Sequence, residues 1–179
     1  MGEAFVGPRR WRAAGWAGLA GLMILVLFLA RAGTGATAAT PDLPVNTGLP
    51  ERVLAIRRDG QELARFTVEL ALTPQTQAIG LMGRPELPPD RGMLFVWPVT
   101  DWVAMWMKNT LIPLDFLFVR SDGTVAAIVH EVPPCPPEGP CPSYVSPEPV
   151  RMVLEIGGGR SRELGLAPGD RLVIIPEEP

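Results

Sequence analysis

Turn signals recur at short intervals along residues 40–179 and limit this part of the chain to short segments of regular structure. The whole sequence holds 21 proline and 19 glycine residues. Proline interrupts helices and strands because it lacks an N–H and fixes φ, and glycine favours turns. A fold of many short strands joined by turns is therefore favoured over one built from long helices.

Most segments between these turns have the pattern of strands. Residues 52–58 and 63–70 flank Asp59-Gly60, a pair typical of a two-residue hairpin turn. Along residues 63–70 apolar and polar side chains alternate, as in a half-buried strand. Further strands are expected at 92–97, 102–107, 114–119, 124–132, 150–156 and 172–175.

Helical signals are few. Thr73 suits an N-cap and Pro74 the first helical position, and Gly83 is placed to end the short helix that they open. Residues 160–164 are expected to form one more helical turn. The predicted fold is mainly β, a small antiparallel sheet curled into a barrel-like domain with one or two short helices.

The first 38 residues have the order of an export signal. Basic residues from Arg9 to Arg12 precede an uncharged run of 18 residues, 13–30, and an Ala-x-Ala-like site follows at 36–38. Such a run can also span a bilayer as a retained anchor, because about 17 to 25 residues are needed. We expect residues 1–38 to be a signal peptide or an N-terminal membrane anchor, and both alternatives stay open.

Either alternative places the rest of the chain outside the cytoplasm, in the periplasm or secreted. Residues 39–51 are expected to be a linker, and residues 52–176 a single β-rich domain. If residues 13–30 are retained, the inner membrane is a partner of the protein.

The charge balance argues against two classes of partner. Residues 1–38 hold four Arg and one Glu, so the remainder has 12 basic and 18 acidic residues, a formal charge of −6. Nucleic-acid binding needs clustered Lys and Arg to neutralise phosphates, so no nucleic-acid partner is expected. The same balance argues against a polybasic contact with anionic lipid.

Cys135 and Cys141 lie in a proline-rich loop. In an oxidising compartment a pair that closes such a short loop is typical of a disulfide, which we expect here instead of a thiolate metal site. His130 is the only histidine, so a metal centre that needs several histidines is excluded. The methionines are expected to fill the core, and no metal or cofactor is predicted.

Residues 106–115 crowd aromatic, cationic, amide and acidic side chains into ten positions. Lys108 is the only lysine, although arginine occurs fifteen times, so its ammonium group is not explained by general surface decoration. If residues 102–107 are extended, Trp102, Trp106 and Lys108 share one face of the strand. This segment is therefore the best candidate for a binding site.

We expect Lys108 to bind an anionic or carbonyl group, Asn109 to orient it, and Trp106 to form a flat wall that suits a sugar ring. Asp115 is expected to hold Lys108 or to accept a hydrogen bond from a ligand hydroxyl. An ordinary ion pair between Lys108 and Asp115 at a strand end is the alternative. The candidate ligand-binding residues are Arg84, Trp106, Lys108, Asn109, Asp115 and Glu155.

Four motifs of the sequence resemble the domain of unknown function 192 family, an uncharacterised bacterial and archaeal group. They lie at residues 80–84, 92–95, 106–115 and 153–155, the last followed by glycines. The similarity covers about residues 52–175. The resemblance implies a compact β-rich domain, often exported, and implies no settled activity.

The predicted function is binding of a small polar ligand, such as a carbohydrate or another envelope component, without catalysis. The first alternative is a carbohydrate-active hydrolase that uses Asp115 and Glu155 as acid and base, if the fold sets them about 5–10 Å apart. Burial would raise the pKa of Glu155 for that role. The second alternative is a scaffold that offers only a protein-interaction surface, so the question of catalysis stays open.

Overall fold

The computed structural model describes residues 43–136 and 138–176. The predicted signal peptide or anchor at residues 1–38 lies outside the described residues, as do residues 39–42 of the predicted linker. Within the described ranges, no helix is long and apolar enough to cross a membrane.

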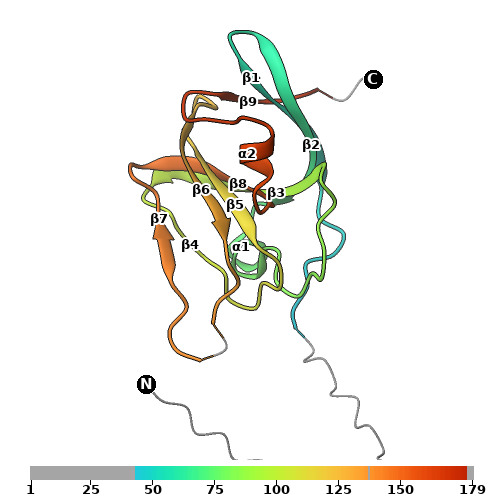
Figure 1. Ribbon diagram of the computed structural model, residues 1–179, viewed down its shortest axis with the longest axis vertical. Coiled ribbons are helices and arrows are strands. Elements are labelled where there is room, and N and C mark those ends of the chain that lie inside the picture. The colour runs from blue at the N-terminus through green and yellow to red at the C-terminus, as the bar shows by residue number, and fades with distance from the viewer. Residues whose placement is uncertain (1–42, 137, 177–179) are drawn as a thin grey trace, which may run out of the picture. The chain divides into compact units, whose positions relative to one another are not determined.

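Nine strands and two short helices make up the described chain (Figure 1). They follow in the order β1 (Glu51–Arg58), β2 (Gln61–Ala71), α1 (Pro74–Ile79), β3 (Arg91–Asp101), β4 (Ala104–Trp106), β5 (Leu114–Val119), β6 (Val125–Val132), β7 (Ser143–Val145), β8 (Val150–Gly157), α2 (Arg160–Glu163) and β9 (Arg171–Ile174). The prediction of a mainly β fold with one or two short helices is confirmed. Strand β7 was not expected from the sequence.

Seven strands form one sheet in the order β6-β5-β8-β3-β2-β1-β9, and β4 and β7 form a separate two-stranded sheet. The large sheet is mixed, which corrects the antiparallel prediction: β2 and β3 pair in parallel because the connection through α1 returns the chain to the same end of the sheet. The sheet also does not close into the predicted barrel. The chain at the start of β6 and the chain at β9 are joined by an isolated bridge between Thr124 and Arg171 and by a few backbone hydrogen bonds, without a ladder of paired strands.

Local sequence signals account for the first elements. Asp59 and Gly60 both have positive φ, 50° and 82°, as a two-residue hairpin turn requires. Thr73 caps α1, because its hydroxyl accepts a hydrogen bond of 3.2 Å from the backbone N of Thr76. The helix ends earlier than predicted, at Gly80 with a φ of 52°, instead of at Gly83.

The large sheet separates two apolar clusters. Leu117 and Leu154 belong to a cluster that packs with Leu164 and Leu166 at and after α2, and we call this side the α2 face. Phe116 and Val153 point the other way. Their cluster, the α1 face, includes side chains that follow α1 and lie in the β4–β7 sheet: Leu81, Met105 and Tyr144. In Figure 1 the β1–β2 hairpin lies at one end of the domain and β4 and β7 lie toward the other.

Two connecting segments are held to the domain. Cys135 and Cys141, between β6 and β7, are at disulfide distance, with Cα atoms 5.1 Å apart, as the short loop predicted. Asn46, in the segment predicted to be a linker, is buried. Its Nδ2 donates to the carbonyl oxygens of Thr76 (2.9 Å) and Gly80 (3.0 Å), so residues ahead of β1 cap the end of α1.

Candidate functional site

The predicted alternation along residues 102–108 is confirmed. Trp102, Trp106 and Lys108 are exposed, whereas Met105 and Met107 are buried in the cluster of the α1 face. Nζ of Lys108 lies 5.2 Å from the centre of the Trp106 ring, which is a cation–π contact. The lone lysine therefore lies over an exposed tryptophan.

Asn109 shapes the turn that carries Lys108. Its φ is 56°, a left-handed conformation that asparagine tolerates better than most residues. The backbone N of Gly83 donates to its carbonyl oxygen (2.9 Å), and the backbone N of Thr110 donates to that of Met107 (3.1 Å). The first bond joins the turn to the chain after α1, and the second closes the turn itself. The loop that carries Lys108 is therefore held in place by backbone hydrogen bonds.

A groove of about 850 Å³ opens beside residues 106–111. The disulfide loop forms its other side through Pro134, Cys135 and Cys141. Its volume is in the range of small-molecule sites. Three of the predicted site residues line it: Trp106, Lys108 and Asn109.

Glu155 is buried beneath the same segment. On β8 it points to the α1 face, between its strand partners Met93 on β3 and Phe116 on β5, and its side chain is 3% exposed. Among the described residues it has no hydrogen-bond or ion-pair partner. Burial raises the pKa of its carboxyl group from 4.5 to about 8, so this group is protonated at neutral pH.

A narrow cavity lies between Glu155 and the groove. Its volume is about 20 Å³, room for one water-sized group. Trp106, Lys108 and Thr110 line both the cavity and the groove, and residues 77–82 line the cavity alone. The structure therefore brings Trp106, Lys108 and Glu155 together, although Glu155 lies 47 positions after Lys108 in the sequence.

Asp115 does not join this site, because it caps the start of α2. It is fully buried on the α2 face. Its Oδ1 accepts hydrogen bonds from the backbone N of Glu131 (2.6 Å) and of Gly159 (2.8 Å). Its Oδ2 accepts from the backbone N (2.7 Å) and the hydroxyl (2.5 Å) of Ser161. Four donors, from the end of β6 and the start of α2, therefore converge on one carboxylate.

This arrangement separates residues that the sequence analysis placed together. Lys108 contacts the Trp106 ring and forms no ion pair with Asp115 within the described ranges. Phe116, not Asp115, is the strand partner of Glu155. Because neighbouring positions on a strand point to opposite faces, Asp115 and Glu155 lie on opposite faces of the sheet. They do not flank a common cavity.

Sequence reasoning missed the side chains that organise the α2 face. Ser161 is fully buried, and its Oγ also lies 2.7 Å from Nδ1 of His130. Because the Ser161 hydroxyl donates its only hydrogen to Asp115, Nδ1 of His130 is the donor in this contact. No local signal links these three positions, since they come from β5, the end of β6 and α2.

Arg84 also lies away from the groove. It donates to both carboxylate oxygens of Glu69, at 2.6 and 2.7 Å, and both side chains are mostly buried. Its Nη2 also donates to the carbonyl oxygen of Asn46 (3.2 Å). Arg84 therefore joins the chain after α1 to β2 and to the segment ahead of β1, a structural contact.

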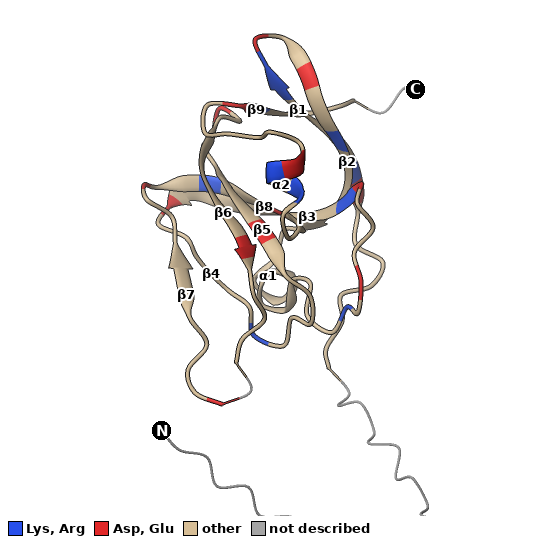
Figure 2. Cartoon of the chain, viewed as in Figure 1, with Lys and Arg blue, Asp and Glu red and all other residues tan. Residues whose placement is uncertain are grey.

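Residues of both charges are spread along the described chain (Figure 2). At least eight arginines of the described ranges lie within 4.0 Å of a carboxylate: Arg57, Arg58, Arg65, Arg84, Arg91, Arg120, Arg160 and Arg162. In the same ranges no group of three or more His, Cys, Asp or Glu side chains is arranged to hold a metal ion.

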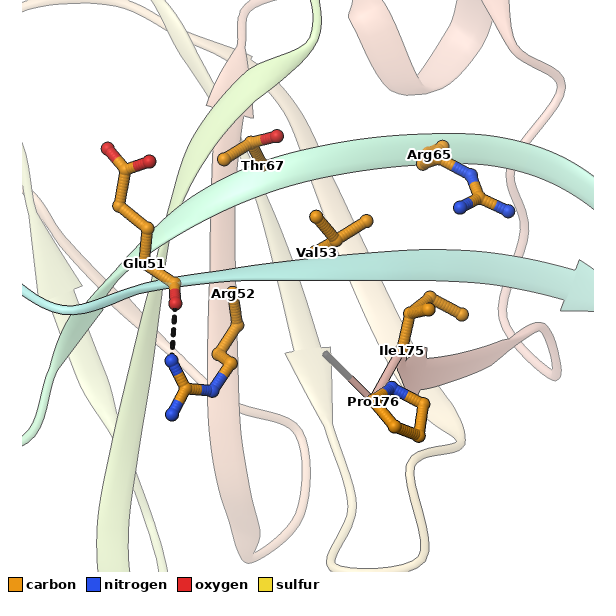
Figure 3. Close-up of a pocket in the computed structure, with 7 residues that line it drawn as sticks. All are labelled: Glu51, Arg52, Val53, Arg65, Thr67, Ile175 and Pro176. Carbon is orange, nitrogen blue, oxygen red and sulfur yellow. Dashed lines mark hydrogen bonds between the residues drawn. The ribbon is translucent and has the colours of Figure 1, made fainter. Parts of the chain in front are cut away.

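A second groove, of about 440 Å³, lies between strands β1 and β2 and the two residues that follow β9 (Figure 3). It is lined by Glu51, Arg52, Val53, Arg65, Thr67, Ile175 and Pro176. Its two cations bond to the protein itself: Arg65 pairs with Glu62 (2.9 Å), and Arg52 donates to the carbonyl oxygen of Glu51 (2.7 Å). The groove at residues 106–111 is the better candidate, because it holds the predicted residues.

Comparisons with known proteins agree with the fold. The family model DUF192, described as uncharacterized ACR, matches residues 54–174. A solved structure from Sinorhizobium meliloti 1021, described as a proposed transcription regulator, is 39% identical, with a TM-score of 0.66, and the match covers 72% of this chain and 97% of that one. A protein of unknown function from Novosphingobium aromaticivorans is 35% identical, with a TM-score of 0.66, and the match covers 76% and 94%. No match was found among curated proteins.

Proposed function

Because this chain belongs to the DUF192 family of uncharacterized proteins, whose name specifies no activity, we propose a function from the site itself: the domain binds a small polar ligand in the groove beside residues 106–111. Lys108 holds an anionic or carbonyl group of this ligand, and Trp106 packs against its flat or apolar part. A carbohydrate or another envelope component fits this description, and binding takes place without catalysis.

One observation carries the proposal. A lone lysine, an exposed tryptophan and a buried carboxyl group without a partner meet at two adjoining cavities. Ligand sites are concave and mostly apolar, with a few polar groups that converge on the ligand. A buried carboxyl group with a raised pKa lowers stability, and such groups cluster at functional sites.

The competing functions have less support. The position of Asp115 on the opposite face of the sheet from Glu155 gives no basis for a glycosidase pair. A role in transcription regulation, as in the description of the Sinorhizobium meliloti relative, is not proposed for this chain. The formal charge of −6 for residues 39–179 does not favour DNA binding. A protein-interaction scaffold is the remaining alternative, and the experiments below separate it from ligand binding.

We also propose that the domain works outside the cytoplasm, either released or tethered by residues 13–30. The pair Cys135 and Cys141 at disulfide distance supports an oxidising compartment. Mass spectrometry of the protein from its native cells should find the disulfide and either a new N-terminus near Ala38 or an intact N-terminus in the membrane fraction. Reduced cysteines in a cytoplasmic fraction would contradict the proposal.

Replacing Lys108 with alanine should abolish the ligand-induced rise in melting temperature. The free energy of unfolding should change by less than about 1 kcal/mol, because the side chain is exposed. The measurement is a thermal-shift screen of the purified protein against sugars, amino compounds, nucleotides and carboxylates, since a bound ligand stabilises by RT ln(1 + [L]/Kd). Lys108→Arg keeps the charge and should retain part of the shift.

Two tryptophans provide a matched control. Trp102 and Trp106 lie on the same face of the extended segment and are 59% and 46% exposed, but only Trp106 lines the groove. We expect the ligand-induced shift to be lost in Trp106→Ala and kept in Trp102→Ala. A screen with no hit, together with loss of a protein partner in Lys108→Ala or Trp106→Ala, would support the scaffold instead.

A further inference from the structure

The Glu155 carboxyl group lacks a partner within the described chain although it is almost completely buried, with 3% exposure. Buried polar groups are normally hydrogen-bonded, and buried charges are normally paired. The side chain lines the 20 Å³ cavity that adjoins the groove. Its position therefore suits a small polar group that arrives with a ligand.

The surroundings of this carboxyl group are apolar on the strand side. β3 and β5 place Met93 and Phe116 beside it, and Met105 of β4 also lines the cavity. None of these side chains carries a charge or a strong hydrogen-bonding group. A ligand group that enters the cavity therefore meets Glu155 as the only acidic side chain of its lining.

No cation is paired with Glu155 in this cavity within the described chain. Gln77 and Thr110 line the cavity with neutral polar side chains, and the last residues of α1, 77–79, also line it. The last turn of α1 holds no basic residue. Lys108 is the only other titratable residue that lines the cavity, and its ammonium group lies over the Trp106 ring. Burial raises the pKa of Glu155, and Lys108 forms no ion pair with it within the described chain.

We propose that the cavity takes a primary ammonium group of the ligand, which forms an ion pair with Glu155, while Lys108 at the rim holds an anionic group of the same molecule. The ligand is then a small zwitterion of the amino-acid type. The volume of about 20 Å³ suits an ammonium group, which is close to water in size. This inference rests on the proposed function and names the ligand class of the same site.

The proposal couples binding to proton release. In the free protein the Glu155 carboxyl group is neutral at pH 7, because its pKa is about 8. When the ammonium group enters, the carboxyl group gives its proton to the solvent, and a carboxylate–ammonium pair remains in the cavity. A ligand hydroxyl would instead hydrogen-bond to the neutral acid and release no proton. Proton release therefore distinguishes an amine from a sugar hydroxyl.

The test is calorimetric titration of the full chain with a panel of amino acids and their N-acetylated forms, in two buffers with different ionisation enthalpies. We expect at least one amino acid to bind with release of nearly one proton at pH 6.5 and of about half a proton at pH 8, where Glu155 is half ionised and the ammonium group of the ligand is still charged. Its N-acetylated form, which lacks the ammonium group, should bind at least tenfold more weakly. Glu155→Gln keeps the shape of the side chain and should lower the affinity at least tenfold and abolish the proton release.

The outcomes separate this inference from the proposed function. If sugars or carboxylates bind in a Lys108-dependent manner and no amino acid binds, the proposed ammonium group is wrong, and the proposed ligand site beside residues 106–111 is retained. Binding of an amino acid without proton release, or equally well to Glu155→Gln, also overturns the inference. If no compound binds the wild-type protein, both proposals fail. The proton count is measured on the wild type, so it does not depend on the folding of a variant.

Discussion

Replacing Asp115 with alanine should lower the free energy of unfolding by about 3–5 kcal/mol. The substitution removes one buried carboxylate that accepts four hydrogen bonds, and it leaves the donors of Glu131, Gly159 and Ser161 without an acceptor. Asp115→Asn should cost less, because one amide oxygen remains, but its amide N–H groups would face the N–H of Ser161. Asp115 therefore acts on stability through the α2 face.

Urea denaturation of the variants measures this effect. The matched control is Asp90→Ala, since Asp90 is exposed and its side chain forms no hydrogen bond or ion pair within the described residues, and this change should stay within about 0.5 kcal/mol. If Asp115→Ala is as stable as the wild type and only loses ligand binding, Asp115 belongs to the binding site and the structural interpretation is wrong.

Replacing Glu155 with glutamine should make the protein more stable at alkaline pH, on the order of 4 kcal/mol at pH 9. The pKa of Glu155 is about 8 in the folded state and 4.5 ordinarily, so the native protein binds this proton more tightly than the unfolded chain does. The favourable contribution is complete below pH 4.5 and is lost as the pH rises to about 8. Glutamine does not titrate, so the variant escapes this loss.

The measurement is the free energy of unfolding of wild type and Glu155→Gln at pH 4.5, 7 and 9. The two proteins should be similar at pH 4.5, and their difference should grow up to about pH 8 and then stay constant. Glu86→Gln is the control, because Glu86 is exposed and its side chain forms no hydrogen bond or ion pair within the described residues, so its difference from wild type should not change with pH. Equal pH dependence for both variants would mean that Glu155 is ionised in the folded protein.

Together these two predictions assign different roles to the two carboxyl groups. Asp115 is satisfied by four donors and supports the fold, whereas Glu155 is buried without a partner and lowers stability increasingly as the pH rises from 4.5 to about 8. A group that costs stability and lines a cavity is better explained by binding than by folding.

Local features of this protein were predictable from the sequence. Asp59-Gly60 makes the hairpin turn and Thr73 caps α1, because both depend on the conformation of a few adjacent residues. The exposure of Trp106 and Lys108 followed from the alternation of side chains along an extended segment. The pairing of Cys135 and Cys141 followed from the short loop between them.

The arrangement of the site was decided only by the tertiary structure. β8 inserts between β5 and β3, and this strand order places Glu155 beneath Lys108 and turns Asp115 toward α2. Arg84 pairs with Glu69 for the same reason, since the chain after α1 returns beside β2. A sequence predicts which side chains share a face of a strand, but which strands become neighbours depends on how distant apolar faces pack together. Residues 106–115 could therefore be proposed as a candidate site from the sequence, whereas the residues that contact them could not be predicted.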